Sequence, residues 1–317
     1  MSTFDPDALE CLAAIVEEGG FERAAQRLSI TQSAVSQRLR ALEVQVGTVL
    51  IVRSRPLKAT GAGQLLLKHT KMLRLLRADL ERDLKELAPS SPGGAREEER
   101  ISIAINADSI ATWAIQALTD LAQQGLPMEI IHDDQNFTHE WLREGQVSGC
   151  VTTVKQALRG CKVAPLGAME YIVVATPAFA QSRLGAKGPA NKRDGKQPAA
   201  ALTAYNFREV PFVAFNRKDE VPGEFVAKAF GLKRVTLNQL FVPSSEGMVR
   251  AVLAGWGVGV VPRLLAQGLI DQGLLVNLVP TYTLPIQLYW HCWNLESEVL
   301  DALTAALKQS SALSLVA

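Results

Sequence analysis

The sequence lacks the features of a secreted, membrane-spanning or metal-dependent protein. Its 317 residues contain four cysteines and four histidines, with no CxxC pair and no spacing typical of a metal site. The acidic first ten residues contain no apolar run, and no segment approaches the ~20 apolar residues that span a bilayer. We therefore expect a cytoplasmic protein with reduced cysteines, without a signal peptide, a membrane segment, a metal ion or a cofactor.

The sequence also lacks the residue patterns of an enzyme active site. The glycines of the GWGVG segment at 255–259 do not have the G-x-G-x-x-G spacing of a dinucleotide-binding loop, and they precede an apolar run. The histidines do not lie in the context of a Ser/His/Asp triad. We therefore expect no catalytic residues and no enzyme activity.

The net charge of +1 conceals an uneven distribution of charge. Between Arg23 and Arg77 the sequence contains eleven basic residues and one acid, which gives this segment a formal charge of +10. Acidic residues are frequent on both sides of it. Such a block is typical of a protein that binds a polyanion, although a solvated face would give the same charge pattern.

Three short helices in this part of the chain have the pattern of a helix-turn-helix. Apolar residues recur at helical spacing in 7–18, 21–28 and 32–45, and a short turn separates the second helix from the third. Thr31 is a suitable N-cap for the third helix. A helical wheel places polar and basic residues opposite its apolar stripe: Ser33, Gln37 and Arg40. This face is typical of a helix that reads DNA.

The next segments predict a wing and a long helix. The apolar run 49–52 precedes an extended segment that suits a wing on the DNA backbone, with three cations: Arg53, Arg55 and Lys58. Residues 63–87 then predict a helix with a leucine at every seventh position: Leu66, Leu73, Leu80 and Leu87. This seam predicts a homodimer, although a helix packed on its own domain would show a similar pattern.

The remainder of the chain predicts an α/β domain. Residues 88–95 (APSSPGGA) have the composition of a hinge, and the polar segment 185–198 is expected to be an exposed loop. Strands and helices alternate, which is typical of a parallel, doubly wound sheet. Helices are expected near 109–122 and 137–144, and strands at 101–105, 128–132, 149–153, 171–175, 211–215, 236–242, 257–261 and 286–293.

These segments resemble the LysR-type transcriptional regulators over nearly the whole chain. The residues FERAAQRLSITQSAVSQRLRALEVQVG at 21–47 resemble the helix-turn-helix of that family, and RSRPLKATGAG at 53–63 resembles its wing and the start of its linker helix. Within the family, the likeness is to the ArgP/LysG type, which regulates the export of basic amino acids. That likeness is carried by INADSIATW at 105–113, by ERAAQRLSITQSAVSQR at 22–38, by the Ser244-Ser245-Glu246 turn and by LYWH at 288–291.

The resemblance implies three parts: a winged helix-turn-helix at 1–60, a linker and dimerisation helix at 61–88, and an effector-binding domain at 96–317. The effector-binding domain would resemble periplasmic binding proteins, with two α/β subdomains: I at about 96–168 and 278–309, and II at about 169–277. The resemblance also implies a homotetramer that binds double-stranded operator DNA and contacts RNA polymerase.

Candidate DNA contacts come from the family resemblance and from the residue patterns of the third helix and the wing. By resemblance, the start of the recognition helix meets DNA: Thr31, Gln32, Ser33, Ser36, Gln37 and Arg38. The helical wheel adds Arg40, and the wing adds Arg53, Arg55 and Lys58 as phosphate contacts. Phosphate contacts would set the salt dependence of binding, and base contacts would set its sequence preference.

Candidate effector contacts are polar residues at strand ends. Doubly wound domains bind ligands at the carboxyl ends of strands, beside helix N-termini. The residues expected to hold the carboxylate and the cationic groups of an amino acid are Asn106, Asp108, Ser109, Asp133, Asp134, Thr152, Thr153, Asp219, Ser244, Ser245 and Glu246. Serine and aspartate before a helix are also ordinary helix caps, and this alternative stays open for each residue.

Together these patterns predict a sequence-specific transcription regulator that responds to lysine or arginine and controls genes such as an amino-acid exporter. The alternatives are a general nucleoid-associated DNA-binding protein, a stand-alone amino-acid-binding protein and, more remotely, an enzyme with a fused helical domain. Salt-sensitive DNA binding by residues 1–90 and preference for one operator would separate them.

Overall fold

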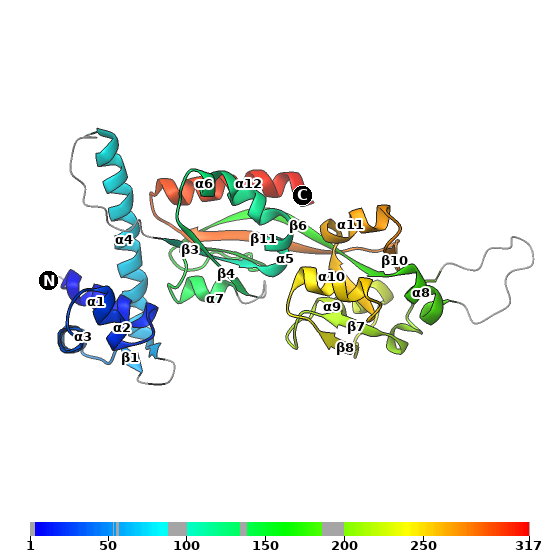
Figure 1. Ribbon diagram of the computed structural model, residues 1–317, viewed down its shortest axis with the longest axis horizontal. Coiled ribbons are helices and arrows are strands. Elements are labelled where there is room, and N and C mark those ends of the chain that lie inside the picture. The colour runs from blue at the N-terminus through cyan, green and yellow to red at the C-terminus, as the bar shows by residue number, and fades with distance from the viewer. Residues whose placement is uncertain are drawn as a thin grey trace, which may run out of the picture.

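The computed structural model contains a small N-terminal head, one long helix and an elongated α/β domain (Figure 1). It describes residues 4–52, 54, 57–87, 100–133, 138–185 and 200–316. Several sequence predictions fall outside these residues: those for Arg53, Arg55, Asp134, the hinge at 88–95 and the loop from 186 to 198.

The head is a helix-turn-helix with a two-stranded wing. α1 (Pro6–Glu17), α2 (Phe21–Arg27) and α3 (Gln32–Val46) each begin and end within one residue of the helices predicted from apolar spacing. β1 (Ile51–Val52) and β2 (Lys58–Ala59) form an antiparallel pair. Apolar side chains from the three helices and β1 pack into one core, which fixes α3 against α1 and α2.

α4 (Gly61–Leu87) leaves the head and runs beside one end of the α/β domain (Figure 1). Its start packs tightly on the wing, because a Cβ atom on Gly63 would lie 2.1 Å from the backbone oxygen of Leu50. Leu66, which the seven-residue spacing assigns to a dimer seam, packs on the head core instead. Further leucines of α4 are exposed in the single chain: Leu65, Leu73, Leu76, Leu80 and Leu84. Exposed leucines at this spacing are typical of a helix that pairs with another helix.

The α/β domain is built on one mixed sheet. Within the described residues the sheet has nine strands, in the order β4-β3-β5-β11-β6-β9-β7-β8, with β10 paired to β6. Their bounds are β3 (Ile101–Asn106), β4 (Met128–Asp133), β5 (Gly149–Thr152), β6 (Cys161–Ala175), β7 (Pro211–Ala214), β8 (Asn238–Phe241), β9 (Val258–Pro262), β10 (Val276–Asn277) and β11 (Leu284–Trp293).

The prediction of a parallel sheet is wrong at its centre. β6 and β11 are antiparallel to each other, β6 is antiparallel to β9, and β11 is antiparallel to β5. The parallel pairs lie on either side of this centre. β6 and β11 carry the chain from one half of the domain to the other and back, so they run in opposite directions. Only 171–175 of β6 was expected, because Pro165 and Gly167 interrupt the apolar pattern of its first part.

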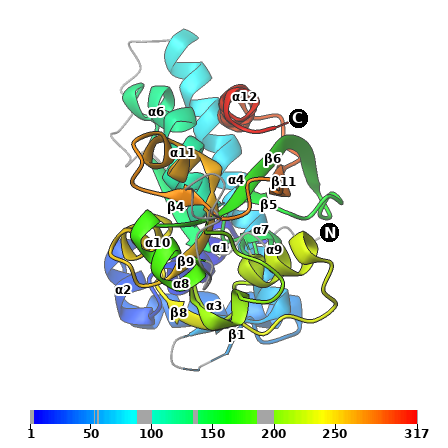
Figure 2. The ribbon, with the colours of Figure 1, turned by 90° about the vertical axis from the view of Figure 1, so that its right-hand side faces the viewer.

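The two crossing strands connect two lobes that lie side by side along the domain (Figure 1), and helices cover both faces of the sheet (Figure 2). The helices of lobe I, which contains β3, β4 and β5, are α5 (Ala107–Ser109), α6 (Ile115–Gln123), α7 (Thr138–Arg143) and α12 (Glu298–Ser314). The helices of lobe II, which contains β7, β8 and β9, are α8 (Pro177–Leu184), α9 (Val221–Phe230), α10 (Ser245–Leu253) and α11 (Arg263–Asp271). A π-helical turn joins α5 to α6, and a short 3-10 helix precedes β7.

Three fully buried tryptophans hold lobe I together: Trp113, Trp290 and Trp293. The indole Nε1 of Trp290 donates a hydrogen bond to Thr304 Oγ1 at 2.9 Å, which ties β11 to α12. On the neighbouring strand, a Cβ atom on Gly149 would lie 2.2 Å from the Trp290 ring. The position beside this ring therefore admits only glycine without rearrangement.

The helices of the described residues include none that is both long enough and apolar enough to cross a membrane. Nor do His, Cys, Asp and Glu side chains of those residues gather into a group of three or more that could hold a metal ion. All four cysteines have free thiols. Burial raises the pKa of the Cys11, Cys150 and Cys292 thiols, which keeps them protonated.

Candidate functional site

The outer face of α3 carries most of the residues predicted to meet DNA. Thr31 is the N-cap of the helix, and its Oγ1 accepts a hydrogen bond from the backbone N–H of Ala34 at 3.2 Å. The helix buries Val35, Leu39 and Leu42 in the head core, which is the face that the apolar spacing predicts. Four of the candidate side chains are exposed: Gln32, Ser33, Gln37 and Arg40. Ser36 and Arg38 are half-buried.

Arg38 lies at the edge of this face and pairs with the neighbouring helix. Its Nη2 lies 3.0 Å from Oδ2 of Asp7 on α1, and its side chain is 38% exposed. A contact from Arg38 to DNA would compete with this ion pair for the guanidinium. Arg40 is more exposed, and it points outward without such competition.

The wing is described only in part. Lys58 begins β2 and is exposed, whereas Arg53 and Arg55 lie outside the described residues. The register of the pair sets Ile51 opposite Ala59 and Val52 opposite Lys58. Residues 53–57 are therefore the connection between the two strands of the wing.

Several cations of the basic segment are engaged inside the protein. Arg74 of α4 donates hydrogen bonds to Glu10 and Glu17 of α1, and Arg27 of α2 lies 2.6 Å from Glu17 Oε2. Burial alone would raise the pKa of the Glu17 carboxylate, but the cations of Arg74, Lys71 and Arg27 hold it below its ordinary value. The formal charge of +10 therefore overstates the positive charge that this segment presents to a partner.

Arg40→Ala is expected to weaken DNA binding without lowering the melting temperature. The side chain is exposed, so its removal leaves the head core intact. If it contacts one phosphate, the slope of log Kd against log salt concentration should fall by about 0.9. Fluorescence anisotropy at several salt concentrations measures this slope. Arg143→Ala, at an exposed position of the α/β domain, is the control that should change neither quantity, and a large fall in the melting temperature of Arg40→Ala would contradict its exposed placement.

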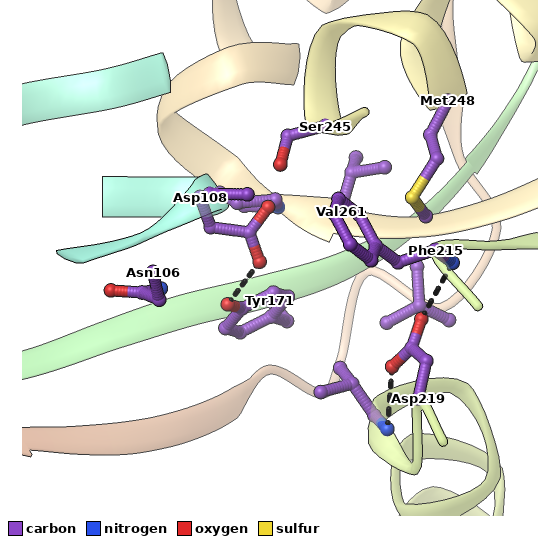
Figure 3. Close-up of a pocket in the computed structure, with 12 residues that line it drawn as sticks. Asn106, Asp108, Tyr171, Phe215, Asp219, Ser245, Met248 and Val261 are labelled. Carbon is purple, nitrogen blue, oxygen red and sulfur yellow. Dashed lines mark hydrogen bonds between the residues drawn. The ribbon is translucent and has the colours of Figure 1, made fainter. Parts of the chain in front are cut away.

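A small cavity lies between the two lobes of the α/β domain (Figure 3). Its volume is about 40 Å³, which is room for about three water molecules. Its wall contains residues from the carboxyl end of β3 in lobe I and from the ends of β7 and β9 in lobe II. The N-termini of α5, α9 and α10 meet there as well. This is the place where doubly wound domains bind ligands.

Asp108 presents its carboxylate to the cavity from lobe I. Its Oδ2 accepts a hydrogen bond from the hydroxyl of Tyr171 at 2.6 Å (Figure 3). Tyr171 belongs to the crossing strand β6 and is 1% exposed. A phenol that donates at this distance suits an ionised carboxylate and fixes its orientation. Asp108 is therefore held in position as an anionic group of the cavity wall.

Asp219 lines the cavity from lobe II and also orders the loop that carries it. Its Oδ2 accepts from the backbone N–H of Phe215 at 2.9 Å, and its Oδ1 accepts from that of Val221 at 3.1 Å (Figure 3). These bonds join the end of β7 to the start of α9. The helix-cap alternative thus describes part of what Asp219 does.

Ser245 is the first residue of α10 and lines the cavity. It is 4% exposed, and its Oγ has no hydrogen-bond partner among the described residues. The preceding residue, Ser244, is a plain N-cap, since its Oγ accepts from the backbone N–H of Gly247 at 3.1 Å. A buried hydroxyl without a partner is costly, so the position of Ser245 is suited to a ligand that bonds to it.

The structure brings four of the predicted effector residues together at the cavity: Asn106, Asp108, Asp219 and Ser245. Five others lie outside its wall: Ser109, Thr152, Thr153, Ser244 and Glu246. The first two of these are buried, Thr153 is half-buried and the last two are exposed. Asp133 ends β4 opposite Asn106, and only its backbone is described.

Sequence reasoning missed Tyr171 and the apolar part of the wall. The apolar residues of the wall come mainly from lobe II: Phe215, Val221, Met248, Val260, Val261 and Pro262. Tyr171 is the first residue of a predicted strand and has the pattern of a core residue. Its position on a strand that crosses between the lobes was the one signal that could have placed it at the cleft.

Comparison with known proteins identifies the family. Residues 6–64 match the bacterial regulatory helix-turn-helix proteins of the lysR family, and residues 94–312 match the LysR substrate binding domain. This chain belongs to the LysR family of transcription regulators. It is 39% identical over 297 residues to ArgP of Aeromonas salmonicida, a match that covers 93% of each chain.

Solved structures of LysR-type regulators share the fold. The crystal structure of ArgP from Mycobacterium tuberculosis matches with a TM-score of 0.81 at 36% identity, over 99% of both chains. Full-length LysG from Corynebacterium glutamicum, with bound effector Arg, matches with a TM-score of 0.71 at 32% identity, over 99% of this chain and 100% of that one.

The family accounts for the two parts of the molecule. This LysR-type regulator is a DNA-binding transcription regulator related to ArgP and LysG, and it is not an enzyme. Consistently, the GWGVG segment at 255–259 is a turn from α10 into β9. A Cβ atom on Gly257 would lie 2.2 Å from the backbone oxygen of Pro211, so this glycine serves close packing.

Proposed function

We propose that this LysR-type regulator responds to a basic amino acid, arginine or lysine, and controls genes such as one for an amino-acid exporter. The main observation that supports the proposal is the negative charge of the cavity wall. Its described wall contains two carboxylates, Asp108 and Asp219, and no lysine, arginine or histidine. Such a wall favours a cationic ligand. The relationship to LysG, which has a structure with bound effector Arg, supports the same proposal.

The proposed ligand lies with its two ends on opposite lobes. Its carboxylate meets the N-terminus of α10, where backbone N–H groups and the helix dipole favour an anion. The unpartnered hydroxyl of Ser245 donates to that carboxylate. A cationic group of the ligand pairs with Asp108, and the aliphatic stem lies along Phe215 and Met248. This arrangement gives the Ser245 hydroxyl a hydrogen-bond partner and places the cation of the ligand beside a carboxylate of the wall.

On the DNA side, we propose a homodimer formed through the exposed leucines of α4, because a helix-turn-helix that reads paired half-sites needs a two-fold protein. The proposed contacts to double-stranded DNA are Thr31, Gln32, Ser33, Ser36, Gln37, Arg38, Arg40, Arg53, Arg55 and Lys58. Two dimers form the proposed homotetramer, and the DNA-bound protein contacts RNA polymerase.

The proposed mechanism is a ligand-dependent change in the spacing of the heads. A ligand that touches both lobes favours the conformation in which the lobes are closed on it. The lobes connect to the heads through α4, so closure changes the distance between paired α3 helices and the bend of the operator. If saturating arginine and lysine leave both the footprint and the DNA bend unchanged, this mechanism is wrong.

A thermal-shift screen against the twenty amino acids tests the effector. A ligand at 100 times its Kd stabilises the native state by about 2.7 kcal/mol, which raises the melting temperature measurably. We expect a shift with arginine or lysine and none with acidic or apolar amino acids. The absence of any shift would remove the effector proposal while leaving the family assignment in place.

Selection of binding sites from a random DNA pool tests sequence specificity. A LysR-type regulator should enrich one motif with two half-sites, and binding to that motif should exceed binding to random DNA by at least ~1,000-fold. Equal affinity for enriched and random DNA would favour a general nucleoid-associated protein instead.

A further inference from the structure

A turn of lobe I is docked on α4. Lys71 Nζ donates a hydrogen bond to the backbone oxygen of Gln146 at 2.9 Å. At the preceding residue, Gly145, a Cβ atom would lie 2.5 Å from the Cβ of Lys68. Gly145 also has a φ of +71°, which favours glycine. The backbone of the turn therefore lies directly against the helix, in a position that leaves little room for adjustment.

The same stretch of α4 holds the head. Arg74 is 10% exposed; its Nε donates to Glu10 Oε2 at 2.9 Å and its Nη1 donates to Glu17 Oε1 at 3.1 Å. One helical turn earlier, Lys71 Nζ lies 3.9 Å from Glu17 Oε1. Lys71 thus contacts the α/β domain through Gln146 and the head through Glu17.

The docked turn belongs to the same rigid unit as the lobe I wall of the cavity. The backbone N–H of Ser148 donates to the oxygen of Ser102 on β3 at 2.8 Å, and the N–H of Trp293 donates to the oxygen of Ser148 at 3.1 Å. β3 leads at its other end directly into Asp108. Rotation of lobe I about the crossing strands therefore moves the Gly145–Gln146 turn together with the cavity wall.

We propose that Lys71 couples the position of lobe I to the strength of the contact between α4 and the head. An ammonium group has three donors and can serve two acceptors at once. In the present arrangement, the bond to Gln146 keeps this ammonium at the far limit of an ion pair with Glu17. Withdrawal of the turn frees it to approach Glu17 and to tighten the contact between α4 and α1. The two positions of lobe I then differ in how firmly the head is held.

This inference rests on the proposed arginine response, and thermodynamic linkage tests both. The arginine Kd of the full-length protein is measured with and without a DNA fragment that the protein has selected from a random pool. The ratio of the two values is the coupling factor, which is roughly 5- to 150-fold in allosteric proteins. By reciprocity, the same factor describes the effect of arginine on DNA affinity.

Lys71→Met is the decisive variant, because it removes the ammonium and keeps an unbranched stem. We expect its coupling factor to fall by roughly 2- to 30-fold, because Lys68, Met72 and Leu75 of α4 also contact lobe I, while its Kd for DNA alone and for arginine alone stay within about twofold of the parent values. Lys71→Arg keeps a charged donor and should restore most of the coupling. Arg77→Met removes an exposed cation of the same helix and should keep the parent factor.

The outcomes separate the two proposals. A Lys71→Met protein with the parent coupling factor overturns the role of Lys71 and leaves the proposed function standing. A parent protein that does not bind arginine, or that shows a factor of 1, overturns the proposed function and the coupling with it. If circular dichroism shows that Lys71→Met is misfolded, Lys71→Gln replaces it, and unchanged coupling in that variant counts equally against the inference.

Discussion

Asp108→Asn is expected to raise the arginine Kd by about 100-fold, which is about 2.8 kcal/mol. The substitution keeps the shape of the side chain and an acceptor for the Tyr171 hydroxyl, but it removes the negative charge that faces the cavity. Asp108 is already half-buried, and the bound ligand would cover it further, so loss of its charge should cost about 2–5 kcal/mol, as for one member of a buried charge pair. Isothermal titration calorimetry of the purified variant with arginine measures the change.

Two further variants show whether the loss of arginine affinity comes from the charge of Asp108 itself. Tyr171→Phe removes the hydroxyl that orients Asp108 and keeps the charge, so we expect a smaller loss of about tenfold. Asp120→Asn, at an exposed position of α6, should leave the arginine Kd unchanged. An Asp108→Asn protein that binds arginine as tightly as the parent would show that another group holds the cation.

Gly149→Ala is expected to lower the free energy of unfolding by about 3 kcal/mol, as overpacking of a filled core does. The added Cβ would lie 2.2 Å from the Trp290 ring and 3.0 Å from the backbone oxygen of His291. The ring has little freedom to move away, because it is fully buried and its Nε1 is bonded to Thr304. Urea denaturation followed by tryptophan fluorescence measures the loss.

Gly268→Ala is the matched control for this prediction. Gly268 lies on the exposed side of α11, and a Cβ atom there meets nothing within 4 Å. Replacing glycine by alanine in an exposed helix stabilises a protein by up to about 1 kcal/mol. A Gly149→Ala protein as stable as the parent would mean that the packing around Trp290 is looser than described.

The elements with strong local patterns were predictable from the sequence. α1, α2 and α3 have amphipathic spacing and clear end signals, such as the Thr31 cap and Gly47 in the left-handed conformation after α3. The strand directions at the centre of the sheet were not predictable in this way. Periodicity reports which side of a strand is buried, but it does not report which way the strand runs.

The candidate site was predictable to the extent that strand ends and helix starts are visible in the sequence. Asp108 and Ser245 follow that rule and line the cavity. Thr152 also ends a strand, but it is buried away from the cavity wall. The strand-end rule predicts at which edge of the sheet a ligand binds, but it does not predict how far each strand end lies from the cleft. Tyr171 and Lys71 act through partners far apart in the chain, and no local pattern identifies such pairs.

The division of the cavity wall between two lobes has a consequence for the timing of the response. In the proposed complex an effector contacts Asp108 on lobe I and Ser245 on lobe II, so it is fully held only after the lobes close on it and is released only after they separate. The observed association rate should then level off at high effector concentration, at the rate at which the lobes close. The residence time of a bound effector follows from the opening rate, and it sets the shortest interval over which the regulator can register a fall in supply.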